Sequence, residues 1–315
     1  MTDDLQIDAN GRLRHLITLE GLGHKRISAL LDRAAALREA FANGVQESKL
    51  LGGRTIINLF FETSTRTRTS FELAARRLGA TVINFDIASS STSKGESLED
   101  TLATLEAMQA DAFVVRHREN GTPARLAASA RRAAILNAGD GNHAHPTQGL
   151  LDALTIRDRH ADFSRLKVTI CGDIRHSRVA RSDLHVLEAL GTADIRLCGP
   201  TTLMPAADEF PHYQRFENFD EAIAGCDVVI MLRLQRERMV EAMIGDEMEY
   251  FSRFGLDARR LHLAAADAMV MHPGPINRGI EIAEDVADGA QSVILDQVAN
   301  GVPVRMAVLA ALLCN

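Results

Sequence analysis

The sequence predicts an α/β protein with two domains, each a parallel sheet flanked by helices. Apolar, β-rich runs alternate with helical patterns almost throughout the 315 residues. This alternation is typical of parallel sheets that are covered by helices on both faces. Eight predicted strands are many for one doubly wound sheet, and a long helical pattern lies midway along the chain, at 147–160. We therefore expect one domain over residues 1–146 and a second over residues 147–299.

Strands are expected where apolar and β-branched residues run together, and helices where apolar residues recur every three or four positions. The predicted strands are 54–61, 81–86, 111–116, 134–138, 166–172, 193–198, 227–232 and 268–272. The predicted helices are 23–43, 70–79, 98–109, 121–132, 147–160, 178–190 and 219–224. The last apolar stretch, 293–313, predicts a helix broken near Gly301 and Pro303, and we expect residues from about 300 to 315 to pack back on the first domain.

Composition narrows the class of protein. A hydrophobic content of 46% and a charged content of 24% are typical of soluble globular proteins. No apolar stretch approaches the roughly 20 residues that span a bilayer, and the N-terminus lacks the pattern of a secretory signal. Four dispersed cysteines without a C-x-x-C pair favour a reduced, cytoplasmic protein. A net charge of −7 without a basic stripe argues against nucleic acid as the main partner.

The most informative segment lies between the strand predicted at 54–61 and the helix predicted at 70–79. Ser64, Thr65, Arg66, Thr67 and Arg68 gather hydroxyl and guanidinium groups at the expected helix N-terminus. Backbone N–H groups and the positive end of the helix dipole point outward there, so the segment predicts a site for phosphate or another oxyanion. An ordinary Ser/Thr N-cap beside two solvated arginines is the alternative.

Polar segments follow six of the eight predicted strands, including the one at 54–61. In open parallel sheets ligands bind beyond the carboxyl ends of the strands, so we expect these segments to converge on a cleft between the domains. They are 62–69, 116–118, 141–148, 172–178, 233–238 and 272–278.

Several side chains in these segments suit anion binding. His145 and Gln148 lie one turn apart at the start of a predicted helix. Arg178 and Arg233 follow strands and can each bind a carboxylate with two hydrogen bonds. The alternatives are a satisfied capping histidine and solvated arginines in an arginine-rich chain. The prolines of the loop at 272–278 leave carbonyl groups to accept from an amine or amide, and a tight turn without a ligand is the alternative there.

Lysine is rare in this chain, which makes Lys94 unusual. Only four of the 35 basic residues are lysines, and Lys94 directly follows the Ser/Thr-rich stretch 89–93. Such a stretch is either a solvated linker or a mobile loop whose lysine closes over an anionic ligand.

Other common catalytic motifs are absent from the sequence. It contains no G-x-x-x-x-G-K-[ST], no G-x-G-x-x-G that opens a helix after a strand, no G-x-S-x-G, and no metal-like spacing of histidine, cysteine and carboxylate residues. We therefore expect no metal and no cofactor. Many oxyanion-binding groups without a nucleophile suit direct transfer between two bound anions, driven by positioning and electrostatics.

These segments resemble the aspartate/ornithine carbamoyltransferase family over nearly the whole chain. Two motifs resemble both branches of the family, Ser64-Thr65-Arg66-Thr67-Arg68 and His145-Pro146-x-Gln148. Three others favour the aspartate branch: Ser93-Lys94-Gly95-Glu96, Arg233-Leu234-Gln235, and His272-Pro273-Gly274-Pro275, where the ornithine branch would show His-Cys-Leu-Pro. Gly274 departs from the Leu or Ala of other members, and the surroundings of Arg178 are variable.

The resemblance implies roles in binding carbamoyl phosphate. Ser64, Thr65, Arg66 and Thr67 are expected to hold its phosphate, and Arg68 to support them or to face a subunit contact. Thr67, Arg116 and His145 are expected to contact the carbamoyl oxygen. Gln148 and the backbone around Gly274 and Pro275 are expected to hold the carbamoyl nitrogen. Arg66, Thr67, Arg116 and His145 would be the catalytic residues.

The resemblance also implies how aspartate binds and how the chains assemble. Arg178, Arg233, Gln235 and Lys94 are expected to bind the carboxylates of aspartate. Ser90 and Lys94 are expected to enter the active site of a neighbouring subunit, so that the minimal assembly is a homotrimer, with or without regulatory or dihydroorotase-like chains.

The implied activity is transfer of the carbamoyl group of carbamoyl phosphate to the amino group of L-aspartate, an early step of de novo pyrimidine biosynthesis. Its products are N-carbamoyl-L-aspartate and phosphate. The alternatives are activity on ornithine, which the arginines at 178 and 233 disfavour because ornithine has a cationic side chain, and a non-catalytic member that acts as an assembly subunit or sensor.

Overall fold

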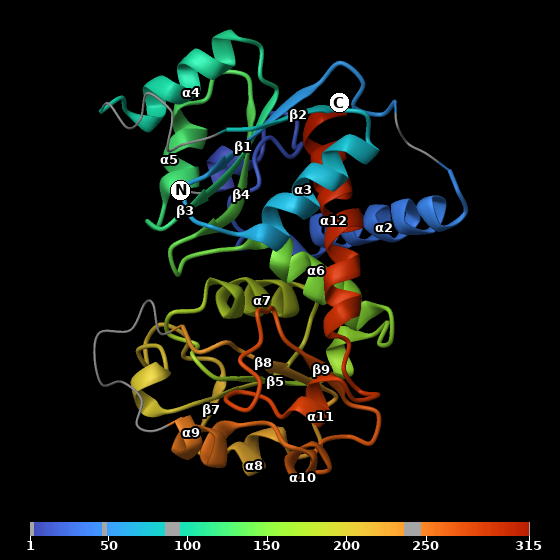
Figure 1. Cartoon of the computed structure of the whole chain (residues 1–315), viewed down its shortest axis with the longest axis vertical. Helices are drawn as coiled ribbons and strands as arrows, with labels where there is room; N and C mark the ends of the chain where they lie inside the picture. The colour runs from blue at the N-terminus through green and yellow to red at the C-terminus, as the bar shows by residue number, and fades with distance from the viewer. Residues whose placement is uncertain (1–2, 46–48, 86–94, 236–246, 315) are drawn as a thin grey trace. The chain divides into compact units, whose positions relative to one another are not determined.

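The computed structural model describes residues 3–45, 49–85, 95–235 and 247–314, and the chain divides into two compact units. Unit 1 comprises Met1–Leu154 and Ala299–Asn315, and unit 2 comprises Thr155–Val298. Each unit contains one parallel sheet with helices on both faces, which confirms the predicted fold class (Figure 1). Ser90 and Lys94, and residues 236–238 of one predicted polar segment, lie outside the described residues.

The sheet of unit 1 has the strand order β2-β1-β3-β4, and all its pairings are parallel. Phe60 pairs with Arg116, and an irregularity after Val115 brings His117 opposite Asp140. The carboxyl ends of three neighbouring strands therefore lie side by side at one edge. The strands are β1 (Thr55–Phe60), β2 (Thr81–Asn84), β3 (Ala112–His117) and β4 (Ala134–Asp140).

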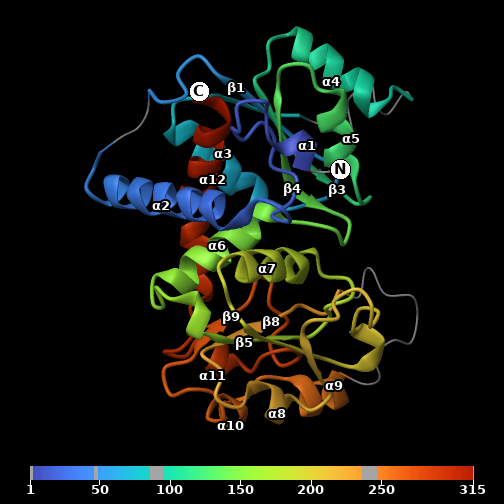
Figure 2. The same cartoon turned by 180° about the vertical axis from the view of Figure 1, so that it is seen from behind.

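Helices cover both faces of this sheet (Figures 1 and 2). Alternate strand residues such as Ile57, Leu59 and Val115 pack with Leu102 of α4 and Leu126 of α5 on one face, as the two-residue period of a strand requires. α3 and α12 lie on the other face, where Arg305 of α12 stacks over the ring of Phe71. The helices that contribute to unit 1 are α1 (Asp3–Gln6), α2 (Gly23–Ala42), α3 (Thr65–Arg77), α4 (Leu98–Ala107), α5 (Thr122–Ser129), α6 (Pro146–Arg157) and α12 (Ile294–Leu313).

The sheet of unit 2 has the order β7-β6-β5-β8-β9 and is also parallel. One core cluster packs residues of β5 and β8 against Phe219 of α8, Tyr250 of α9 and Val286 of α11, and α7 lies on the opposite face (Figure 2). The strands are β5 (Lys167–Cys171), β6 (Asp194–Cys198), β7 (Gln214–Phe216), β8 (Val228–Met231) and β9 (Met269–Met271). The helices are α7 (Arg178–Ala189), α8 (Phe219–Ile223), α9 (Glu247–Phe254), α10 (Ala258–Leu261) and α11 (Glu284–Ala287), with 3₁₀ turns at Phe163–Arg165 and Thr201–Leu203.

Two helix predictions need correction. The helix predicted at 70–79 begins at Thr65, because polar residues fill its first turns and hide the apolar period. The helix predicted to break near Gly301 and Pro303 is continuous from Ile294 to Leu313. Proline removes one backbone donor, whereas residues 303–310 are all buried, so packing outweighs the lost hydrogen bond.

The sequence patterns also missed several short elements. β7 has three residues and the helices α1, α10 and α11 have four each, which is too short for a period to be recognised. Within the described ranges, no helix has the length and hydropathy that crossing a membrane requires.

Glu106, in the last turn of α4, holds the chain that leads into β4. Its carboxylate accepts the backbone N–H groups of Arg131 at 3.0 Å, Arg132 at 2.6 Å and Ala133 at 2.7 Å. Burial alone would raise the pKa of Glu106, but these backbone donors more than offset it and lower the pKa below its usual 4.5. The charged form is therefore the one that stabilises the fold.

We predict that Glu106→Gln lowers the free energy of unfolding by about 1–2 kcal/mol at neutral pH, because an amide replaces a charged acceptor. A lowered carboxyl pKa contributes stability above the unfolded value, and this contribution is lost as the pH falls through the folded value. The difference between parent and variant should therefore shrink below about pH 4.5. Urea unfolding over a pH series measures it.

Glu99→Gln is the matched control, because Glu99 lies on the same helix and makes an exposed ion pair with Arg125. This change should cost less than about 1 kcal/mol. Equal losses in the two variants, or a Glu106→Gln effect that does not change with pH, would contradict the assignment.

Candidate active site

The 64–67 segment joins β1 to α3 and forms the N-terminal turn of that helix. Ser64 is the N-cap, and the Arg68 N–H donates to the Ser64 carbonyl at 3.2 Å, which is the first hydrogen bond of the helix. The N–H groups of residues 65–67 belong to the first turn, where backbone donors lack acceptors within the helix. Thr65 and Arg66 are exposed and Thr67 is buried.

The cap of α3 differs from two other serine caps in the chain. Ser97 accepts the N–H of Asp100 at the start of α4, and Ser177 accepts the N–H of Ala180 at the start of α7. Ser64 makes no such capping hydrogen bond, and no acidic residue lies in the first turn of α3. This turn therefore keeps the electropositive character that favours a bound anion.

Arg116 lies at the carboxyl end of β3, next to the segment that begins α3. Its guanidinium pairs with Glu62 at 3.1 Å and donates to the carbonyl of Ala138 at 3.2 Å. Its side chain is 11% exposed. The guanidinium is thus held between the ends of β1 and β4.

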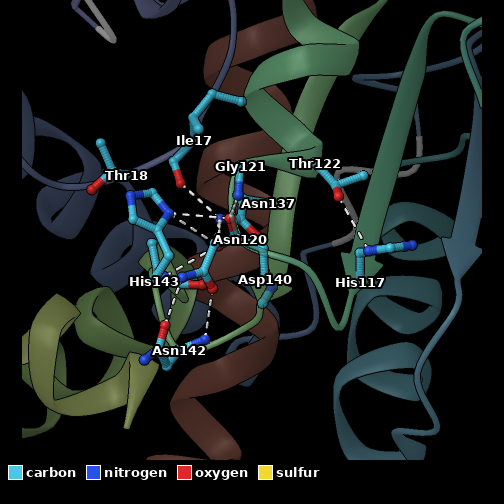
Figure 3. A network of polar contacts seen from close by, with 12 residues as sticks. Ile17, Thr18, His117, Asn120, Gly121, Thr122, Asn137, Asp140, Asn142 and His143 are labelled. Carbon is cyan, nitrogen blue, oxygen red and sulfur yellow. Dashed lines mark hydrogen bonds and ion pairs between the residues drawn. The ribbon is translucent and has the colours of Figure 1, made fainter. Parts of the chain in front are cut away.

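The β4–α6 loop (141–145) leads to His145, which immediately precedes α6 and is buried. Asp140, the last residue of β4, lies beneath this loop and is fully buried. Figure 3 shows its carboxylate at the centre of a polar network with Gly121, Asn137 and His143. His143 Nδ1 lies 3.1 Å from Oδ2 of this carboxylate, and the Ala144 N–H donates to Oδ1 at 3.1 Å.

Gln148 lies in the first turn of α6, one turn beyond His145. Its Nε2 donates to both carboxylate oxygens of Asp152, at 3.1 and 3.2 Å. This pair sets the orientation of the amide, so that the Gln148 oxygen is the end that can accept a hydrogen bond from a ligand.

The loop after β5 in unit 2 leads to Arg178, the first residue of α7, which is 6% exposed. Asp173 in this loop is fully buried and accepts from His176 Nδ1 at 2.8 Å. Burial raises the pKa of Asp173, while His176 and the backbone N–H of Gln235 oppose that rise. Gln235 follows β8, so one carboxyl group links the loops that carry Arg178 and Gln235. Arg233, also after β8, is half-buried.

The loop after β9 contains Gly274 and Pro275. His272 Nδ1 accepts the Gly274 N–H at 2.8 Å, so the ring proton lies on Nε2, which faces Oε1 of Glu281 at 3.2 Å. The same Oε1 accepts the Asn277 N–H at 2.6 Å, and both His272 and Glu281 are buried. Gly274 has a φ of +64°, a conformation that favours glycine.

The structure thus brings the predicted residues together in two groups. Within unit 1, the ends of β1, β3 and β4 carry Ser64–Thr67, Arg116, His145 and Gln148. Within unit 2, the ends of β5, β8 and β9 carry Arg178, Arg233, Gln235, Gly274 and Pro275. Sequence reasoning missed the carboxylates beneath these loops, Glu62, Asp140, Asp173 and Glu281. A carboxylate at or just after a predicted buried strand was the available signal for the first three.

Comparison with known families assigns both units to one class of protein. Residues 14–158 match the model of the aspartate/ornithine carbamoyltransferase carbamoyl-P binding domain, and residues 164–312 match the Asp/Orn binding domain of the same family. The chain therefore belongs to the aspartate/ornithine carbamoyltransferase family.

Individual relatives lie in the aspartate branch. The chain is 56% identical over 311 residues to the aspartate carbamoyltransferase catalytic subunit of Xanthomonas campestris pv. campestris, which covers 98% of this chain and 99% of that protein. It is 54% identical to the catalytic subunit of Stenotrophomonas maltophilia, with 98% of each chain covered.

Solved structures confirm the fold. Aspartate transcarbamoylase from Trypanosoma cruzi, in complex with carbamoyl phosphate and aspartate, has a TM-score of 0.86 at 31% identity. The alignment covers 98% of this chain and 100% of that structure's chain. Ornithine carbamoyltransferase from Pyrococcus furiosus has a TM-score of 0.87 at 26% identity, and the alignment covers 96% of this chain and 97% of that one. The fold is therefore shared by both branches, and sequence similarity distinguishes them.

Proposed function

We propose that this chain transfers the carbamoyl group of carbamoyl phosphate to the amino group of L-aspartate, giving N-carbamoyl-L-aspartate and phosphate, an early step of de novo pyrimidine biosynthesis. The observation that carries the proposal is the arrangement in unit 1. There an uncapped helix N-terminus follows β1. Arg116 near the end of β3 and His145 at the end of the β4–α6 loop lie at the same sheet edge. The 56% identity to an aspartate carbamoyltransferase catalytic subunit supports the choice of second substrate.

Carbamoyl phosphate binds through its phosphate at the start of α3 in this proposal. A phosphate dianion needs hydrogen-bond donors. The first-turn N–H groups and the Arg66 guanidinium can only donate, and the hydroxyl groups of Ser64 and Thr65 can also donate. Thr67 is buried, unlike the exposed Thr65 and Arg66, and in this proposal its hydroxyl reaches the transferred carbamoyl group.

The amino group of aspartate then attacks the carbamoyl carbon, and negative charge develops on the carbamoyl oxygen. Thr67, Arg116 and His145 donate to that oxygen, and each such donor is worth about 3–4 kcal/mol in the transition state. The Gln148 oxygen, oriented by Asp152, and the backbone around Gly274 and Pro275 accept from the carbamoyl nitrogen. Phosphate departs at the 64–67 segment, and we assign the amine proton to this departing phosphate.

Aspartate binds in the second part of the site. Arg178 and Arg233 hold its two carboxylates, and Gln235 and Lys94 complete the set of donors. The two units correspond to a carbamoyl-phosphate-binding domain and an aspartate-binding domain. Ornithine, with a cationic side chain, would be repelled by the same arginines.

The proposed assembly is a homotrimer of a cytoplasmic enzyme. In this proposal Ser90 and Lys94 serve the active site of a neighbouring subunit, and Arg68 either supports the 64–67 segment or faces a subunit contact. The trimer acts either alone or in a larger assembly with regulatory or dihydroorotase-like chains. All four cysteines lie in the described part of the chain and none forms a disulfide there, which suits a reducing compartment.

We predict that the purified chain releases phosphate and forms a carbamoylated product from carbamoyl phosphate and L-aspartate. With L-ornithine in place of aspartate, turnover should be lower by at least about 10³-fold, because a buried cation beside arginine is strongly disfavoured. Phosphate release and mass detection of the product measure both reactions. Preferential turnover of ornithine would support the other branch, and no turnover with either would support a non-catalytic role.

We predict that Arg233→Ala raises the KM for aspartate by about 10²-fold while the KM for carbamoyl phosphate changes little, because truncation removes a charged pair with one substrate only. Arg253→Ala is the control, because Arg253 is exposed in the same unit and lies 3.9 Å from Glu249. Steady-state kinetics with each substrate varied separately measure the change. Equal losses for both substrates would contradict the assignment of Arg233.

We predict that active sites are shared between subunits. Lys94→Ala and His145→Ala chains should each be nearly inactive alone, since each removes one part of every site. Mixed trimers contain some sites in which both parts are intact, so activity should reappear after the two variants are dissociated and reassembled together. If mixing restores no activity although mass measurement finds mixed trimers, each chain is self-sufficient.

A further inference from the structure

Asp140 is a fully buried carboxylate that joins two loops of unit 1 (Figure 3). Oδ2 accepts the Gly121 N–H at 2.8 Å, from the end of the β3–α5 loop (118–121). Oδ1 accepts the Ala144 N–H at 3.1 Å, from the β4–α6 loop, and Asn137 Nδ2 at 2.8 Å. His143 Nδ1 lies 3.3 Å from Oδ1 and 3.1 Å from Oδ2.

The same two loops are joined a second time, beside the carboxylate. Asn120 Nδ2 donates to Asn142 Oδ1 at 2.7 Å, and the Asn142 N–H donates to Asn120 Oδ1 at 2.9 Å. The Gly141 N–H donates to the His117 carbonyl at 3.0 Å. A Cβ on Gly141 would lie 1.8 Å from Asn120 Oδ1, so the loops meet without space for a side chain there.

The joined loops adjoin the two donors proposed for the carbamoyl oxygen, since Arg116 lies in β3 just before one loop and His145 ends the other. Ala144, which donates to Asp140, directly precedes His145. Arg116 directly precedes His117, whose carbonyl accepts from Gly141, and its guanidinium donates to Ala138 two residues before Asp140. Displacement of either loop would therefore change the separation of the Arg116 and His145 side chains.

Asp140 is held in its charged, accepting form. Burial would raise the pKa of this carboxyl group, but the donors His143, Asn137 and Gly121 more than offset it and lower the pKa below the usual value. Asparagine in its place would present an amide group to two or more N–H donors, and at least one hydrogen bond would be lost.

We propose that Asp140 is a positioning residue, which aligns Arg116 and His145 by holding the β3–α5 and β4–α6 loops together, and that it does not touch the substrate. This inference rests on the proposed function, because the alignment matters only if both side chains stabilise the same oxygen. A misplacement of about 1 Å at such a site costs about 10² in rate.

The test compares Asp140→Asn with Glu106→Gln in the full-length chain. Both replace a buried carboxylate that accepts backbone N–H groups beside β4, but Glu106 acts at the opposite end of that strand. In Asp140→Asn, kcat for carbamoyl transfer should fall by about 10²-fold, while the dissociation constant of inorganic phosphate changes by less than about threefold, because Asp140 does not contact the 64–67 segment. In Glu106→Gln, kcat should stay within about twofold of the parent although stability falls.

A loss of kcat in Asp140→Asn together with unchanged phosphate binding supports the proposal. Retained kcat, or equal kcat losses in the two variants, overturns it. If Asp140→Asn does not fold, the Asn120→Ala variant provides the test. Asn120 is exposed, and this variant loses only the two hydrogen bonds between Asn120 and Asn142. A loss of about tenfold in kcat with unchanged phosphate affinity is then expected, and full activity overturns the proposal. A parent protein that does not carbamoylate aspartate refutes the proposed function itself, and the positioning role with it.

Discussion

Hydrogen bonding of backbone N–H groups to buried carboxylates is the interaction on which the candidate site depends. Loops that leave a parallel sheet expose backbone donors to a partly dry environment, where an unmatched donor costs about 1–3 kcal/mol. Here Asp140 satisfies donors of two loops in unit 1. In unit 2, Asp173 accepts backbone N–H groups of His176 and Gln235 from two loops, and Glu281 accepts the N–H of Asn277 within one loop. The loops that carry the proposed ligand-binding residues are thereby held in place by buried carboxylates.

This arrangement separates two tasks. Arginine and hydroxyl groups at the sheet edge are the groups proposed to bind anionic substrates, whereas the buried carboxylates accept backbone N–H groups and fix the backbone. Negative charge so near an anion site would weaken binding if it were not neutralised. The charge of Asp140 is stabilised by N–H donors and lies beside His143, and Glu62 is paired with Arg116. The net field at the sheet edge can then remain favourable to anions.

The sequence predicted the layout of the fold well and the supports of the site poorly. The alternating pattern predicted eight of the nine strands that the described residues contain, because each of those eight is an apolar run. β7 is only three residues long and carries two polar ones, so no pattern marked it. The residues expected to bind substrate stand out because serine, threonine, arginine and histidine are unusual directly after a buried strand. Asp140 follows a predicted strand, but its hydrogen bond to the N–H of Gly121 depends on a contact that only the fold creates. Glu281 does not stand out, since it follows no predicted strand.

The likeness to both branches of the family indicates where substrate selectivity resides. TM-scores of 0.86 and 0.87 to an aspartate and an ornithine enzyme mean that the backbone does not distinguish the two second substrates. Selectivity must then come from side chains, and a site that forms ion pairs with a carboxylate rejects a cation because both attraction and desolvation oppose it. The half-buried Arg233 and the buried Arg178 lie on loops that Asp173 and its neighbours hold in place. A change of second substrate would therefore require new charges on loops that are held in this way.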